Sequence, residues 1–120
     1  MKNADQITEE LKQFIGSSVI YEHWLGISYT EGVQYLAEAA SAYWLLDLIA
    51  SHQTKRFLSN PKLQDFQIWR LSVHENSGTL ICEWDTNMEV LRQEIEYTDF
   101  PLQSIKLYLV RQVLMLPSEY

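Results

Sequence analysis

The chain has 120 residues, of which 47% are hydrophobic and 12% aromatic, and these values predict one well-packed globular domain over residues 1–120 rather than a disordered chain. Nine Lys and Arg residues stand against sixteen Asp and Glu residues, and this net charge of −7 disfavours binding to nucleic acid, which depends on basic contacts to phosphates. The apolar runs are too short to span a membrane. A polar start and a lone cysteine, Cys82, predict a cytoplasmic protein without disulfides.

The first predicted element is a helix over residues 4–15. Asn3 and Gln6 have the spacing of a capping box, and Gly16 follows as a stop signal. One face of this helix is apolar, at Ile7, Leu11, Phe14 and Ile15. The next stretch, residues 17–29, fits either a short strand or a turn of helix, and the pattern does not decide between them.

A long helical pattern starts at Thr30, a good N-cap, and runs to Gln53. Around Leu45 it is apolar on nearly every side, so we expect this segment to be the most buried. Small residues at 39–41 indicate a break, with Ser41 capping a second helix. Residues 54–62 then form a basic loop with a turn at Asn60-Pro61.

From residue 66 the apolar period changes to two, which predicts strands. The segments 66–74 and 79–84 flank a turn at residues 75–78 and form a hairpin. We choose the register in which apolar residues face apolar residues and an acid faces a base. In this register Trp69 lies opposite Trp84, Leu71 opposite Cys82, Val73 opposite Leu80, and Arg70 opposite Glu83.

A third strand is predicted over residues 89–97. Residues 102–116 fit a helix or a hairpin about Arg111-Gln112, and we favour the hairpin, with Leu109 opposite Leu114. The fold class is therefore α+β, with N-terminal helices packed on one face of an antiparallel meander of about five strands. At the C-terminus we expect residues 113–116 to form a strand that Pro117 ends. Residues 119–120 should fold back onto the domain or a second copy.

Five motifs in order resemble those of a known family: "YEHWLGISYTEGVQYLAE", "AYWLLDLIAS", "FQIWRL", "YTDFPL" and "LPSEY". The chain from Phe14 to Tyr120 resembles an uncharacterised bacterial family, common in cyanobacteria and catalogued as domain of unknown function six-eight-seven-six. Relatives often have Gly near residues 111–112 and Gly-Gly near residues 40–41, which would favour the hairpin and the helix break. This chain has neither. The family has no assigned catalytic residue, so the resemblance implies no site.

The residues themselves offer few chemical candidates. No pair of histidines has metal-ligand spacing, and no phosphate loop or nucleophile motif is present, so no metal and no cofactor are predicted. We interpret His52 as a residue that ends a helix, His74 as solvated and Cys82 as a buried, inert thiol. Asp47 lies among apolar residues, where it could sit on an exposed edge or bond an aromatic side chain. Alternatively it could belong to an aromatic pocket made by Tyr21, His23, Trp24, Tyr43, Asp47, Tyr97 and Asp99.

The sequence therefore leaves the biochemical function open, and its motifs favour a protein that is not an enzyme. The first hypothesis is a small acidic module that binds a protein partner or forms a homodimer, because a sheet of this kind has free edges. The alternative is a small-molecule-binding protein or enzyme that uses the pocket near Tyr43, Asp47 and His23. A ligand for such a pocket cannot be named from the sequence.

Overall fold

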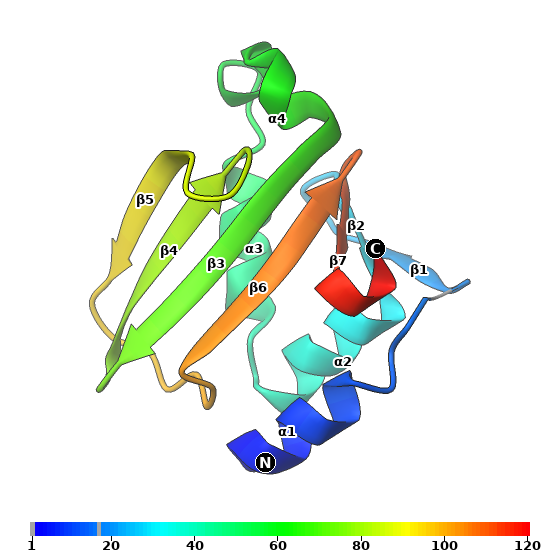
Figure 1. Cartoon of the computed structure of the whole chain (residues 1–120), viewed down its shortest axis with the longest axis vertical. Helices are drawn as coiled ribbons and strands as arrows, with labels where there is room; N and C mark the ends of the chain where they lie inside the picture. Colours follow the sequence, from blue (N-terminus) through cyan, green and yellow to red (C-terminus); the bar gives the residue numbers. More distant parts are fainter. Residues whose placement is uncertain (1, 17) are drawn as a thin grey trace.

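A computed structural model describes residues 2–16 and 18–120 (Figure 1). A seven-stranded sheet in the order β1-β2-β7-β6-β3-β4-β5 has the helices α1 to α3 on one of its faces. No helix in the described residues is long and apolar enough to cross a membrane. The elements in chain order are α1 (Ala4–Leu11), β1 (Ile20–Glu22), β2 (Ser28–Thr30), α2 (Glu31–Ala39), α3 (Tyr43–Ser51), the 3₁₀ turn η1 (Phe57–Ser59), α4 (Pro61–Asp65), β3 (Phe66–His74), β4 (Ser77–Glu83), β5 (Glu89–Ile95), β6 (Ser104–Val110), β7 (Val113–Met115) and the 3₁₀ turn η2 (Pro117–Glu119).

The sheet confirms the α+β class but not the five-stranded antiparallel meander. Two further strands, β1 and β2, come from the stretch that the sequence left undecided, and β2 pairs with β7 in parallel. β6 returns to pair with β3 instead of β5. The prediction failed because strands of three residues are too short to show a period of two, and pairing between distant segments leaves no local pattern.

The helix α1 has the predicted capping box between Asn3 and Gln6, but it ends at Leu11 rather than at residue 15. Phe14 still packs at the helix layer, with its ring 5.4 Å from that of Tyr35. Ile15 is 79% exposed. The apolar pattern over residues 4–15 was therefore partly a helix face and partly a chain segment crossing to α2.

The long helical segment begins at the Thr30 cap and breaks where predicted, between Ala39 and Tyr43. Ser41 does not cap α3, however. It has φ of 52° and ends α2, with the amide of Ala42 donating to Ala37 O at 2.9 Å. A left-handed residue closed by such a bond is the usual Schellman ending of a helix, so Ser41 stands where glycine is preferred.

The hairpin of β3 and β4 forms with the predicted faces but with a register shifted by two residues. Trp69 pairs with Cys82 and Leu71 with Leu80, so Trp84 does not face Trp69. The turn holds only Glu75 and Asn76, since His74 already pairs with Ser77. A shift of two preserves which side chains face inward, and this is why the pattern alone allowed the error. Arg70 and Glu83 still form an ion pair at 2.7 Å, although not as direct cross-strand partners.

The chain from 104 to 115 is a hairpin, as favoured, with Leu109 opposite Leu114. Arg111 and Gln112 both have positive φ, at 49° and 68°. Positive φ at both central residues is the requirement of the tight turn that joins twisted strands. The geometry of the hairpin therefore prevailed over the poor turn propensity of the Arg-Gln pair.

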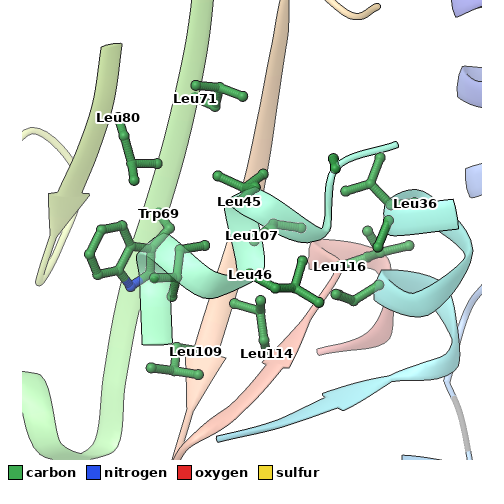
Figure 2. Packing of buried hydrophobic residues seen from close by; sticks show 14 of the residues in the cluster. Leu36, Leu45, Leu46, Trp69, Leu71, Leu80, Leu107, Leu109, Leu114 and Leu116 are labelled. Carbon is green, nitrogen blue, oxygen red and sulfur yellow. The ribbon is translucent and has the colours of Figure 1, made fainter. Parts of the chain in front are cut away.

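The core lies between α2, α3 and the inward face of the sheet (Figure 2). Trp69 on β3 is the largest fully buried side chain. Leucines of α2 and α3 meet those of the central strands, and the labelled residues are Leu36, Leu45, Leu46, Leu71, Leu80, Leu107, Leu109, Leu114 and Leu116. Alternate residues of β3 and β6 face this layer, as a one-sided sheet requires.

The C-terminal residues fold back as expected. Val113–Met115 form β7, and Pro117 starts the turn η2. The Glu119 carboxylate accepts hydrogen bonds from the Thr30 hydroxyl at 2.6 Å and from the Leu116 amide at 3.0 Å. The Tyr120 ring is 5.4 Å from the ring of Phe66, on the face of the sheet opposite the helices.

Candidate functional site

His23 and Asp47 come together although 24 positions separate them in the chain. His23 follows β1 in the β1–β2 connection, and Asp47 lies midway along α3. The distance from His23 Nε2 to Asp47 Oδ1 is 2.7 Å, and the Leu25 amide donates to His23 Nδ1 at 3.0 Å. Because Nδ1 accepts a hydrogen bond, the network assigns the imidazole proton to Nε2, which donates to Asp47.

This arrangement occupies both nitrogens of His23. The imidazole is only 6% exposed, whereas the Asp47 side chain is 50% exposed and faces water on its other side. A general base needs a free nitrogen within reach of a substrate proton, and His23 has none while both bonds are made. The pair therefore fastens the β1–β2 connection to α3.

The remaining candidates from the sequence are placed around this pair or far from it. Trp24 stacks on His23 with ring centroids 5.8 Å apart and is 78% exposed. Tyr21 stacks on Tyr29 at 5.5 Å. The Tyr43 hydroxyl donates to Glu38 at 2.8 Å, and burial together with that carboxylate raises the pKa of Tyr43 to about 12.

Tyr97 and Asp99 do not converge with these residues. They follow β5, which is the sheet edge opposite β1. The amide of Thr98, between them, donates to Asn76 O in the β3–β4 turn. Both side chains are exposed. Trp24 contacts His23 and His23 contacts Asp47, whereas Tyr97 and Asp99 lie apart from these three residues.

A cavity of about 420 Å³ lies instead at the other end of α3. Its walls come from the end of α3, from η1 and α4, and from the start of β5. This volume is within the range of small-molecule sites. The lining residues are Ser51, His52, Thr54, Arg56, Phe57, Asn60, Leu63, Val90 and Leu91.

Two polar side chains of this cavity, His52 and Asn60, form hydrogen bonds with neighbouring residues. His52 ends α3, as predicted, and its Nε2 is 2.8 Å from Gln93 Oε1 while its ring stacks on Trp69 at 5.7 Å. Asn60 Oδ1 accepts from the Lys62 amide and so caps α4. Within the described part of the chain, the Arg56 guanidinium has no hydrogen-bond or ion-pair partner. Among the described residues, the cavity thus offers hydrogen-bonded polar side chains and an arginine without a partner.

A model of the "Family of unknown function (DUF6876)" matches residues 5–120. The chain belongs to this family. No curated protein and no solved structure matches it. The DUF6876 assignment confirms the resemblance found in the sequence and supplies no function for any residue.

Sequence analysis of this DUF6876 chain missed the cavity. Part of the signal was visible, since Lys55, Arg56 and Lys62 made the segment 54–62 basic. The apolar wall opposite comes from β5, about thirty residues later, and no spacing rule links the two segments. Among the described residues no three His, Cys, Asp or Glu side chains gather as metal ligands.

Proposed function

We propose that this DUF6876 protein is a small non-enzymatic module that associates with a second copy of itself through the free edge of β5. In the part of the chain that the structure describes, β5 is the last strand in the sheet order and pairs with β4 alone, on its inner side. An edge strand offers unpaired backbone donors and acceptors to another strand. The other edge strand, β1, has three residues, whereas β5 has seven.

Register and alternation identify the free backbone groups of β5. The Val73 amide donates away from β4, to Gln103 O. Backbone groups alternate sides along antiparallel strands, so the groups that β3 directs toward β4 belong to His74, Ser72 and Arg70. By the same alternation, Leu80 of β4 and its partner Gln93 of β5 direct their N–H and C=O groups toward each other. The flanking residues Arg92 and Glu94 therefore direct their N–H and C=O groups to the open edge. Four groups centred on Gln93 are in position to bond a second copy.

The side chains of β5 favour one register for that pairing, and this self-complementarity is the observation that carries the proposal. With Gln93 opposite Gln93 of the second copy, Arg92 faces Glu94 twice across the twofold axis. On the helix side, Leu91 faces Ile95 twice. Opposite charges and apolar pairs stabilise cross-strand contacts, and an isologous pair makes each contact twice.

The neighbouring registers are unfavourable. Sliding the copies one way places Arg92 opposite Arg92, and sliding them the other way places Glu94 opposite Glu94. Like charges directly opposite destabilise a strand pair. In the monomer Arg92 bonds the exposed Glu89 at 2.8 Å, and such surface pairs are easily exchanged. Arg92 and Glu94 thus disfavour the other registers of β5 pairing and permit the one with Gln93 opposite Gln93.

Sedimentation over a range of protein concentrations tests this proposal. Arg92→Glu and Glu94→Arg should each raise the dimer dissociation constant about tenfold or more, since each creates two like-charge contacts. The double variant restores both opposite-charge contacts and should recover the dimer. Lys106→Glu, which changes the charge equally on an inner strand, serves as the control. A monomer at every concentration, or a double variant no better than the single ones, would contradict the proposal.

Cys82 supports two further parts of the proposal, a role without catalysis and a cytoplasmic location. Burial, with a smaller effect from Glu83, raises the pKa of the Cys82 thiol to about 12. A thiol with so little thiolate at neutral pH is a poor nucleophile, which supports a role without covalent catalysis. A single buried cysteine also suits a reducing compartment.

A further inference from the structure

We infer that the cavity between α3, α4 and β5 binds a small organic monoanion with an apolar body, such as a carboxylate on an aromatic or aliphatic group. The cavity is lined by residues of one copy, and its wall residue Leu91 also faces the second copy in the proposed dimer. The volume of about 420 Å³ suits a ligand of that size. The ligand class follows from the apolar floor, from the free donors and from the local charge.

The floor of the cavity is apolar. Phe57 and Leu63 contribute from η1 and α4, and Leu91 contributes from β5. Leu63 is 2% exposed, and Phe57 packs 6.4 Å from the buried Trp69 ring. These side chains belong to the core or rest on it, so the surface they present is fixed before a ligand arrives. Such a floor favours a hydrocarbon body over a sugar or another strongly polar group.

The rim of the cavity carries hydrogen-bond donors. The Arg56 guanidinium is unpaired within the described residues. Asn60 uses its Oδ1 for the Lys62 amide, which leaves its Nδ2 group available. The Thr54 oxygen accepts from the Phe57 amide, so its hydroxyl hydrogen remains free to donate. Three donors with an arginine among them match a carboxylate, which accepts paired hydrogen bonds from a guanidinium.

The segment that forms the α3–α4 side of the cavity carries a charge opposite to that of the whole molecule. Lys55, Arg56 and Lys62 are three of the nine basic residues, and no acidic residue occurs from 48 to 64. The Lys62 ammonium group lies 4.0 Å from the Trp84 ring centre. The overall charge of −7 opposes polyanions at longer range. A single negative charge is therefore favoured over a di- or triphosphate.

Two-dimensional NMR titration tests this inference with hexanoate, phenylacetate and indoleacetate as probes, and with phenylacetamide as the neutral counterpart of phenylacetate. We expect saturable shifts of the amides of residues 51–60, 62–63 and 90–91 with at least one carboxylate. Phenylacetamide should bind more weakly than phenylacetate. No saturable shift with any of the carboxylates, or equal binding of acid and amide, would overturn the inference.

Three variants locate the carboxylate. Arg56→Gln and Asn60→Asp should each weaken binding about tenfold or more, through loss of a charge-assisted bond and through repulsion. Aspartate is as good a helix cap as asparagine, so α4 should keep its start in the Asn60→Asp variant. Lys55→Gln removes the neighbouring charge, which does not line the cavity, and should change binding much less. If Lys55→Gln weakens binding as much as Arg56→Gln, the ligand is held by general charge and the assigned site is wrong.

Discussion

At the scale of single residues, a hydrogen bond from His23 links the β1–β2 connection to α3. Replacing it with Ala removes the bond to Asp47 and the acceptor for the Leu25 amide. We expect urea denaturation to show a loss of about 1 to 2 kcal/mol, because one bond involves a charged group that is still half exposed. Asp47→Asn retains an acceptor oxygen and should cost less. Equal losses in the two variants would contradict a hydrogen-bond role for the imidazole.

Cys82 should make the stability of the protein depend on alkaline pH. Burial raises the pKa of this thiol from 9.0 to about 12, so the folded state keeps the proton that the unfolded state releases. The free energy of unfolding should therefore be unaffected below pH 9 and should fall between pH 9 and 12. Tyr43 titrates in the same range in every variant.

Comparing the pH profiles of the native chain and Cys82→Ala isolates the thiol. The Ala variant should be less stable at neutral pH because it leaves a small cavity, and its stability should fall less steeply above pH 9. Parallel profiles would show that the thiol ionises as easily in the folded chain as in the unfolded one.

At the scale of elements, the C-terminal turn η2 fastens β7 to the start of α2. Glu119 accepts bonds from Thr30, Gly32 and Leu116, and Ser118 donates to Phe14 O. Deleting residues 118–120 should lower the melting temperature by several degrees, since these donors lose a carboxylate partner. Tyr120→Ala, whose ring is 73% exposed, should change it little. An unchanged melting temperature in the deletion would mean that η2 contributes nothing to the fold.

The same elements show how far the sequence could predict the fold. The caps of α1 and α2, the break near Ser41 and both hairpins were visible because capping residues and periodicity are local signals. The register of β3 against β4 was wrong because a shift of two residues preserves every face. The parallel pair of β2 and β7 joins segments from opposite ends of the chain, and no local pattern encodes it.

The candidate site was less predictable than the fold. The sequence grouped His23 and Asp47 because aromatic and polar residues stood out in both segments, and the structure has a hydrogen bond between them. Tyr97 and Asp99 were grouped with them on composition alone, and the sheet order separates them. The cavity at Arg56 depends on the way a loop rests against an edge strand. That contact is a tertiary property and leaves no spacing in the sequence.

At the scale of the whole molecule, charge and edges are distributed unevenly. This acidic chain has three of its cations in the segment 54–62, on one side of the cavity. Its longer edge strand, β5, carries Arg92 and Glu94, which would pair with each other in an antiparallel copy of the same strand. The first feature supports a ligand and the second a dimer. The dimer is the central claim, and it fixes which residues of the two copies lie opposite each other.

Disulfide trapping measures that register most directly. In a Cys82→Ala background, Gln93→Cys places two cysteines opposite each other at a pair whose Cα atoms should be about 4.5 Å apart, a distance that a disulfide spans. Val90→Cys, at a more exposed position of the same strand, should leave its two cysteines about 20 Å apart. Mild oxidation should therefore crosslink the Gln93→Cys protein rapidly and the Val90→Cys protein hardly at all. Equal crosslinking of the two variants, or faster crosslinking through the more exposed Val90→Cys, would contradict the β5 dimer.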